Sequence, residues 1–412
     1  MGVIRVLHEA SKLGWSMTDP TWINLGQGQP EPGELEGAPP RLSAITLDPT
    51  DHAYGPLEGL PELRARIAED YNRRFRVGKA SQYGPENVAI APGGRQALTR
   101  TAASLGETVL GYQLPDYTAY EEMIAAHLDR LTPVALRGEE SAGFLVPAER
   151  VAEAMTEQGV SAYLLSNPVN PTGSSMRGDD LARLVALSQT RGLTLLSDEF
   201  YSHFVYDVDA NGVATPGKGP VSAAAFVDDV EEDPVLIFDG LTKNHRYPGW
   251  RIGWVVGPSH LVEATARTAS SLDGGPSRPS QRFAMAALEP DRADDETTNL
   301  RVRFCEKRNL MIERLTEMGV RFPGVSDSTF YCWGDLSGLP AGMNDGMSFF
   351  RKALERKVIT VPGEFFDVDP GHRRPGPSPY RNFMRFSFGP PIQDVRRGLG
   401  LLAEMVGTPA KV

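Results

Sequence analysis

The segment PVLIFDGLTKNHRYPGWRIGWVVG (residues 234–257) contains two short apolar runs, VLIF and WVV, separated by a mostly polar stretch. Lys243 lies just after the first run, and Arg251 lies just before the second. Short apolar runs bounded by glycine and proline are typical of strands buried inside a sheet. The segment therefore predicts two buried strands, with an amine and a guanidinium at the edge of the sheet.

Five further runs of the same kind lie upstream of this segment. They are NVAIA (87–91), TVLGY (108–112), TPVALR (132–137), SAYLLS (161–166) and LTLLSDE (193–199). Helical patterns such as RQALTRTAASLG (95–106) and DDLARLVALSQTRG (179–192) lie between several of them. This alternation predicts an α/β domain with a mostly parallel seven-stranded sheet whose strands are buried on both faces. We expect this large domain to span residues 51–294.

The two ends of the chain have a different pattern. The apolar residues Val3, Ile4, Leu7 and Ala10 have helical spacing and predict an N-terminal helix. Residues 297–319 form a long helical pattern, and TFYCWGDL (329–336) and MRFSFG (384–389) resemble strands. We expect a smaller α+β domain from both ends, with an arm and part of that domain in 1–50 and the rest in 295–412. The segment ANGVATPGKGP (210–220) is expected to be a surface loop.

Composition excludes several classes of protein. The chain has 412 residues, 41% of them apolar, and a formal net charge of −11 without a basic patch, so nucleic-acid binding is not expected. No apolar run approaches the roughly 20 residues that cross a bilayer, and the start lacks the order of a signal peptide. Cys305 and Cys332 are too few for a disulfide framework and are expected to be buried thiols in a reducing compartment. These features predict a cytoplasmic protein without a membrane or metal site.

Candidate binding residues follow several of the predicted strands, where ligands gather in α/β sheets. In APGGRQAL (91–98), Gly93 and Gly94 would leave backbone N–H groups free to bind an anion at a helix start, although a plain turn explains them equally well. In SNPVNPTG (166–173), two prolines stiffen a turn that could hold Asn170 in a cleft, unless it is only a rigid turn. In INLGQGQPEPG (23–33), Glu31 stands where a dinucleotide-binding motif needs glycine, which leaves a tight loop near a ligand.

Charged residues at two other strand ends complete the set. The apolar strand in LTLLSDEFY (193–201) ends in Asp198 and Glu199, and a buried carboxylate at Asp198 needs a cation or donor. Tyr201 lies three residues further on and could face the same side. Burial and nearby positive charge would lower the pKa of Lys243 and make its amine a nucleophile for carbonyls, although a single lysine is more often solvated. Arg251 offers a planar fork suited to phosphate. Together these groups describe a pyridoxal 5′-phosphate site.

The chain also resembles a known family over residues 20–405. The motifs are YGPLEGLPELR, PGGRQAL, LPDYTAY, NPVNPTG, SDEFY, TKNHRYPGWRIGW and MRFSFG, in this order and spacing. They are similar to those of the fold-type I pyridoxal phosphate-dependent aminotransferases of class I/II, the aspartate aminotransferase superfamily. The resemblance implies that Lys243 forms an aldimine with the cofactor and moves a proton. It further implies that Asp198 keeps the ring nitrogen protonated, that Tyr201 and Asn170 donate to the ring oxygen, and that Tyr117 stacks on the ring.

The resemblance also implies how phosphate and substrate are held. Backbone amides of Gly94 and Arg95, with the Arg251 side chain, would bind the phosphate. Tyr54 would reach the phosphate in a neighbouring subunit, which implies a homodimer with shared active sites. For the substrate, Arg385 would grip the α-carboxylate, with Asn170 nearby and the Gly26–Gly28 loop closing over it.

The sequence departs from the family at several positions. Gly240 stands where many relatives carry a phosphate-binding serine, and Thr242 could supply a hydroxyl instead. Arg95 is large for its position, so its side chain would leave the pocket or add charge near the phosphate. His245 is expected to pack at the surface rather than act in catalysis. Arg278 is expected to be solvated rather than to bind a second acidic group of the substrate.

Three functions are compatible with parts of this pattern. The leading hypothesis is an aminotransferase that passes the amine of an α-amino acid to a 2-oxo acid. The alternative is a lyase or synthase that eliminates or replaces a β or γ group, as do the 1-aminocyclopropane-1-carboxylate synthases acting on S-adenosylmethionine. A non-enzymatic effector module of a transcription regulator is not expected, because the motifs begin by residue 24 and leave no room for a helix-turn-helix domain ahead of them.

Overall fold

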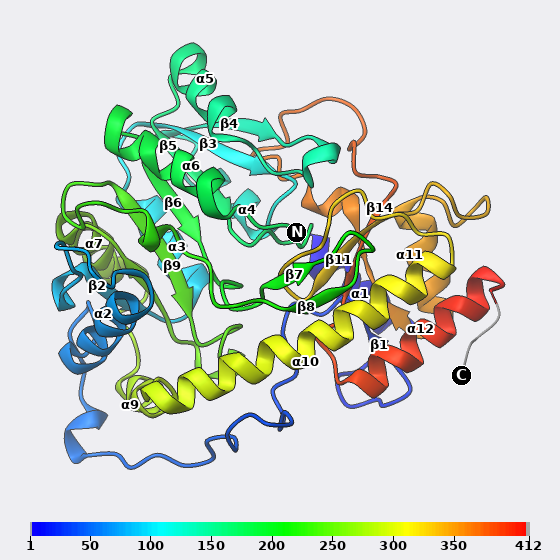
Figure 1. Cartoon of the computed structure of the whole chain (residues 1–412), viewed down its shortest axis with the longest axis horizontal. Helices are drawn as coiled ribbons and strands as arrows, with labels where there is room; N and C mark the ends of the chain where they lie inside the picture. The colour runs from blue at the N-terminus through cyan, green and yellow to red at the C-terminus, as the bar shows by residue number, and fades with distance from the viewer. Residues whose placement is uncertain (1, 409–412) are drawn as a thin grey trace.

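A computed structural model describes residues 2–408 of the chain (Figure 1). A seven-stranded sheet has the order β2-β10-β9-β6-β5-β3-β4, in which β10 is antiparallel to both neighbours and the other pairs are parallel. Its strands are β2 (Val88–Ala91), β3 (Thr108–Leu114), β4 (Leu131–Arg137), β5 (Ala162–Ser166), β6 (Thr194–Asp198), β9 (Val235–Gly240) and β10 (Gly253–Val256). Each corresponds to one predicted apolar run, so the predicted α/β class and the mostly parallel sheet are confirmed.

The sheet is buried on both faces because successive side chains alternate between two cores. In β9, Leu236 and Phe238 belong to one hydrophobic cluster, whereas Val235 and Ile237 belong to the other. The helices are α1 (Gly2–Lys12), α2 (Pro61–Phe75), α3 (Gly94–Ser104), α4 (Ala119–Ala125), α5 (Ala148–Gln158), α6 (Gly178–Arg191), α7 (Ser259–Arg267), α8 (Ala269–Leu272), α9 (Arg278–Ala287), α10 (Pro290–Glu317), α11 (Gly346–Glu355) and α12 (Ile392–Val406). Within residues 2–408, none of the helices combines the length and the hydrophobicity that a membrane span requires.

A smaller α+β part joins the two ends of the chain. Strand β1 (Ile23–Asn24) pairs in parallel with β12 (Val358–Ile359), and β11 (Tyr331–Asp335), β14 (Phe383–Ser387) and β13 (Val361–Pro362) form a second, antiparallel sheet. Figure 1 shows α10 running along the molecule between the two parts, beside the hairpin β7–β8. The smaller α+β part built from both ends is therefore confirmed. The domain limits at 50/51 and 294/295 stay a prediction.

Two expectations about the periphery need revision. The segment 210–220 is not only a loop, because it contains β8 (Ala214–Pro216), which pairs with β7 (Tyr206–Val208) just ahead of the segment. Ala214 is buried and exchanges two backbone hydrogen bonds with the Asn309 side chain of α10, at 2.9 and 2.8 Å. The N-terminal helix is confirmed as α1, but Val6 and Ala10 are its buried apolar residues and Ile4 is 62% exposed.

Candidate active site

A cavity of about 730 Å³ lies where β5, β6 and β9 end and the smaller α+β part approaches. All of the predicted site residues except Tyr54 line it. They are Gly28, Gly94, Arg95, Tyr117, Asn170, Asp198, Tyr201, Thr242, Lys243, Arg251 and Arg385. Residues from positions 28 to 385 therefore meet around one space.

Lys243 lies on the turn that follows β9, with its amine in the cavity. Its Nζ donates a hydrogen bond to the carbonyl oxygen of Gly28. Burial lowers the pKa of Lys243 to about 7, and the positive charges of Arg385, Arg251 and Arg95 contribute to this shift. The charge of Asp198 acts in the opposite direction. A large fraction of the amine is therefore neutral, and nucleophilic, at neutral pH.

Asp198 ends β6 and turns its carboxylate towards the same cavity. Burial raises the pKa of Asp198 to about 6, although hydrogen bonds from Tyr120 and from the Phe200 amide oppose this shift. The hydroxyl of Tyr120 donates to Oδ2 at 2.7 Å, and the amide of Phe200 is 3.4 Å from Oδ1. Tyr120 was not among the predicted site residues. The motif LPDYTAY could have identified Tyr120, because it lies three residues after Tyr117 and therefore close to Tyr117 once a helix begins.

Arg385 reaches the cavity from β14 of the smaller part. Its Nη1 donates to Oδ1 of Asn170 at 2.9 Å, and its Nη2 donates to the carbonyl oxygen of Gly26 at 2.8 Å. The guanidinium lies 4.1 Å from the ring centre of Tyr331 and 4.9 Å from that of Phe366. Its Nε is buried and has no hydrogen-bond partner among residues 2–408. A buried donor without a protein partner beside a cavity is free to donate to a ligand or to water.

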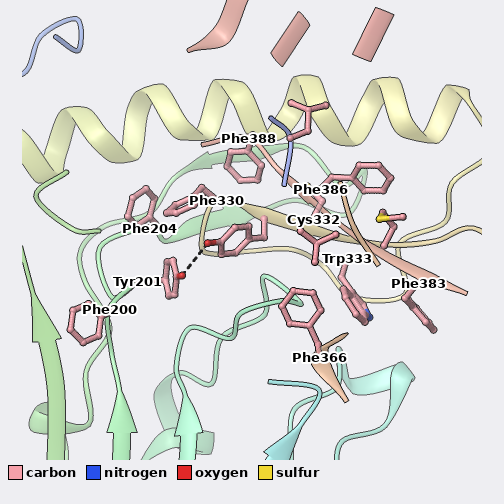
Figure 2. Packing of buried hydrophobic residues seen from close by; sticks show 14 of the residues in the cluster. Phe200, Tyr201, Phe204, Phe330, Cys332, Trp333, Phe366, Phe383, Phe386 and Phe388 are labelled. Atoms are coloured by element: carbon pink, nitrogen blue, oxygen red, sulfur yellow. Dashed lines mark hydrogen bonds between the residues drawn. The ribbon is translucent and has the colours of Figure 1, made fainter. Parts of the chain in front are cut away.

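Tyr201 closes one side of the cavity and leads into the aromatic core of the smaller part. Its hydroxyl lies 3.1 Å from that of Tyr331, and its ring contacts Phe330. Figure 2 shows Tyr201 beside Phe204 and Phe330, with the cluster continuing towards Trp333 and Phe383. The two parts of the molecule thus share one packed aromatic cluster behind the site.

The predicted phosphate-binding groups are the backbone amides of Gly94 and Arg95 at the start of α3 and the Arg251 guanidinium, and we call these three groups the anion cradle. The carbonyl of Gly93 accepts from the amides of Gln96 and Ala97, and the amides of Gly94 and Arg95 precede these at the start of the helix, where backbone donors have no acceptor within the helix. Gly93 has a φ of +91°, and a Cβ there would overlap Nη2 of Arg251. Only glycine lets the backbone turn so close to this guanidinium.

The Arg95 side chain reaches the ring that the resemblance places over the cofactor. Its Nη2 donates to the hydroxyl of Tyr117 at 2.8 Å, and both side chains line the cavity. Arg95 is therefore one of three arginines facing the same space, with Arg251 and Arg385. Of the two expectations for Arg95, departure from the pocket is wrong, and its charge is instead added near the lysine.

The absence of a serine at position 240 has a steric cause. A Cβ on Gly240 would lie 2.6 Å from the carbonyl oxygen of Ile252 and 2.7 Å from Cα of Gly253. Gly240 and Gly253 are directly paired between β9 and β10, so these backbones cannot separate without breaking the ladder. Thr242 lines the cavity instead and presents a side chain next to Lys243.

Two residues differ in position from expectation. His245 is buried rather than at the surface, because its turn lies against α10 and α2 beside His203, 6.1 Å away between ring centres. Burial lowers the pKa of His245 to about 4. Arg278 is not solvated, since its Nη2 lies 3.4 Å from Oδ1 of Asp51 and 3.2 Å from the hydroxyl of Thr50. Tyr54, which is expected to serve a neighbouring subunit, is 97% exposed and does not line the cavity of its own chain, so its role stays a prediction.

The fold and the cavity define an enzyme of the aminotransferase type, and comparison with known proteins identifies the family. The family model of the class I and II aminotransferases matches residues 20–400, so the chain belongs to that family. An aspartate aminotransferase of Streptomyces avermitilis is 28% identical over 362 residues, which cover 85% of this chain and 84% of that protein. An aspartate/prephenate aminotransferase of Thermus thermophilus is 28% identical over 358 residues, which cover 86% of this chain and 83% of that protein.

The fold agrees with solved structures of the same family. The aspartate aminotransferase from Thermus thermophilus with maleate superposes with a TM-score of 0.77 over 98% of this chain and 96% of that chain, at 23% identity. The relatives in sequence carry aminotransferase names. The chain is therefore an enzyme of the aminotransferase class, and the elimination or replacement chemistry on an S-adenosylmethionine-like substrate is not favoured.

Proposed function

We propose that the chain transfers the amine of an α-amino acid to a 2-oxo acid with pyridoxal 5′-phosphate as cofactor. One observation carries the proposal. The amine of Lys243, the carboxylate of Asp198 and the guanidinium of Arg385 line the same cavity. The reaction needs a nucleophile for a carbonyl, a carboxylate that pairs with a protonated ring nitrogen, and a guanidinium that binds the substrate carboxylate.

The donors around the cavity fit the cofactor. The anion cradle suits its phosphate, Asp198 its ring nitrogen, and the hydroxyl of Tyr201 with the amide of Asn170 its ring oxygen. The Tyr117 ring would stack on the cofactor ring. When bound, pyridoxal phosphate withdraws electrons from Cα of the amino acid and weakens its bond to hydrogen.

The residues of this chain then supply proton transfer and orientation. Because the pKa of Lys243 is about 7, its amine can take a proton from Cα and return it at neutral pH. Asp198 would hold a proton at the ring nitrogen, and Arg385 would orient the substrate through its α-carboxylate. Gly28, whose carbonyl accepts from Lys243, lies on the loop that would cover the substrate and exclude water.

A dicarboxylic amino acid is the proposed substrate class. If Arg251 binds the cofactor phosphate and Arg385 the α-carboxylate, Arg95 remains as a third cation that faces the cavity, bonded to the Tyr117 hydroxyl and to no carboxylate of residues 2–408. A second carboxylate on the substrate would supply an anionic partner. The relatives described above are named aspartate or aspartate/prephenate aminotransferases, which supports the same class.

We further propose that the working unit is a cytoplasmic homodimer with shared active sites. Tyr54 is 97% exposed on its own chain, which suits a residue that completes the site of a partner. The segment that carries it is held by ion pairs from Asp51 to Arg278 and Arg282. Cys305 and Cys332 are buried and free, which supports a reducing compartment.

Half-reaction spectroscopy tests the proposed reaction. The protein loaded with pyridoxal phosphate is mixed, in the absence of a 2-oxo acid, with aspartate and in a separate sample with S-adenosylmethionine, which carries a γ leaving group. Transamination converts the cofactor to pyridoxamine phosphate and releases one equivalent of 2-oxo acid, whereas elimination releases ammonia and regenerates the starting spectrum. A Lys243→Ala variant should not develop the visible band of the loaded protein. Ammonia release without pyridoxamine phosphate would contradict the proposal.

A further inference from the structure

One buried side chain, that of Asn244, joins the two segments that carry the proposed catalytic groups. Asn244 follows Lys243 directly and is fully buried. Its Nδ2 lies 2.9 Å from Oδ1 and 3.0 Å from Oδ2 of Asp239, and 3.0 Å from the hydroxyl of Ser202. Its Oδ1 accepts from the amide of His203 at 3.2 Å. The Asn244 side chain therefore bonds to Asp239, ahead of Lys243, and to Ser202 and His203, which follow Tyr201.

The partners of Asn244 are fixed in their turn. Asp239 belongs to β9, and its Oδ1 accepts from the amide of Gly240 at 2.6 Å. The Ser202 hydroxyl lies 3.4 Å from Oδ2 of Asp239 and closes a triangle of three buried polar groups. Ser202 directly follows Tyr201 in the chain. None of the three residues of this triangle, Asn244, Asp239 and Ser202, lines the cavity.

We propose that Asn244 is a positioning residue of this site, which sets the place of the Lys243 amine relative to Asp198 and Tyr201. The reason is geometric. A lysine stem is long and flexible, so the place of its amine depends on how firmly its backbone is held. The contact of Nζ with Gly28 cannot do this during the proposed reaction, because the same nitrogen must then bind a carbonyl carbon. The triangle instead holds the backbone at Asn244, directly after the lysine, and its hydrogen bonds do not involve the lysine amine.

The residue type follows from the partners. Asn244 must donate to the carboxyl group of Asp239, whose pKa burial raises well above its ordinary value, and to a hydroxyl, and it must also accept from a backbone amide. Only a carboxamide offers two donors and an acceptor at this length. The double substitution Asp239→Asn with Asn244→Asp exchanges the two side chains and keeps them paired. The carboxamide at position 239 would then donate to the carboxylate at position 244 and still accept from the Gly240 amide. The carboxylate at position 244 would accept from the His203 amide and from the Ser202 hydroxyl.

The experiment compares Asn244→Ala, the exchanged double variant Asp239→Asn/Asn244→Asp, and the control Asn87→Ala. Asn87 is also buried, accepts from the Gly84 amide at 2.8 Å and donates to the Gly257 carbonyl at 3.0 Å, but lies away from the cavity. Three quantities are measured: the melting temperature, kcat and KM of the loaded protein, and the pH midpoint of acylation of Lys243 in the cofactor-free protein, followed by mass spectrometry.

In Asn244→Ala we expect kcat to fall about tenfold or more with a smaller change in KM, because buried donors and acceptors lose their partners and the turn relaxes. The acylation midpoint of Lys243 should move away from about 7. The exchanged variant should recover both values, and Asn87→Ala should lose melting temperature while keeping both. Should Asn244→Ala not fold, Ser202→Ala, which removes one corner of the triangle, takes its place: a positioning role predicts a lower kcat and a moved acylation midpoint, whereas a merely structural role predicts a lower melting temperature with both unchanged.

The inference is overturned if Asn244→Ala lowers only the melting temperature, as Asn87→Ala does. It is also overturned if the exchanged double variant regains the melting temperature but not kcat and the acylation midpoint of Lys243. The proposal rests on the proposed function only for its kinetic part. The acylation midpoint needs no cofactor, so a failure of transamination in the unaltered protein would leave that measurement valid.

Discussion

The hydroxyl of Tyr120 donates a hydrogen bond of 2.7 Å to Oδ2 of Asp198, and both side chains are buried. This bond favours the charged carboxylate, whereas burial favours the neutral acid and raises the pKa of Asp198 to about 6. Asp198 is therefore mostly ionised at neutral pH, although the margin is small. Tyr120 thus increases the fraction of Asp198 that is ionised and can pair with a protonated ring nitrogen.

Replacing Tyr120 by Phe should raise the pKa of Asp198 above about 6 and weaken cofactor binding. A hydrogen bond to a charged group contributes about 1.5–3 kcal/mol, so the Kd for pyridoxal phosphate should rise about tenfold or more, measured by absorbance titration. Tyr163→Phe is the control, because the hydroxyl of Tyr163 is buried without a partner among residues 2–408. Equal affinities of the two variants would contradict this role of Tyr120.

The reactivity of Lys243 should depend on pH with a midpoint near neutrality. Its pKa of about 7 lies below the ordinary value, so the amine is protonated and inert below this pH and neutral and nucleophilic above it. In the cofactor-free protein, the rate of adduct formation with pyridoxal should therefore rise through about pH 7 and then level. Borohydride trapping and peptide mapping measure it, with Lys243→Arg as the control that gives no adduct. A midpoint near that of an exposed lysine would contradict the assignment.

Gly240→Ser should destabilise the protein, although a hydroxyl at this position could reach a phosphate. The added Cβ would lie 2.6 Å from the Ile252 carbonyl oxygen, and such overpacking costs about 1–3 kcal/mol. We expect a fall of several degrees in melting temperature, measured by calorimetry. Gly219→Ser is the matched control, because a Cβ there meets no atom within 4 Å. Similar melting temperatures for both variants would show that β9 and β10 can separate.

Arg385→Lys should raise KM for amino acids about tenfold or more with little loss of folded protein. The substitution keeps the charge but removes the planar fork that a carboxylate can bind with two hydrogen bonds. Steady-state kinetics measure the change, and Arg150→Lys on the exposed face of α5 serves as the control. Unchanged KM in Arg385→Lys would place the substrate carboxylate elsewhere.

Mixing two inactive chains tests the proposed homodimer. A Tyr54→Ala chain and a Lys243→Ala chain can form a mixed dimer with one complete site, provided that Tyr54 serves the partner. Random mixing should then restore activity in about a quarter of all sites. If Tyr54 acts within its own chain, no mixed dimer has a complete site and activity stays at the level of the separate variants.

The sheet was predictable from sequence because each of its strands is an apolar run of its own. The hairpin β7–β8 was not, since its glycines and proline suggest a loop and its strand depends on Asn309, which lies 95 residues further along the chain from Ala214. The residues that line the cavity were predictable where a motif marks them. Tyr331 and Asn244 were missed because their contacts come from distant segments, as with the 130 residues between Tyr201 and Tyr331. His245 was placed wrongly because burial depends on α10 and α2, which its own sequence does not reveal.

The bond from Arg385 to the carbonyl of Gly26 joins residues that are 359 positions apart. During synthesis on the ribosome, the segments that carry Gly94, Asp198, Lys243 and Arg251 emerge long before Arg385 does. A growing chain can therefore assemble the proposed cofactor pocket while its amino-acid grip is still missing. Because Arg385 also helps to lower the pKa of Lys243, a chain truncated after the seven-stranded sheet would lack both the proposed contact with the substrate α-carboxylate and part of the reactivity of the amine at neutral pH.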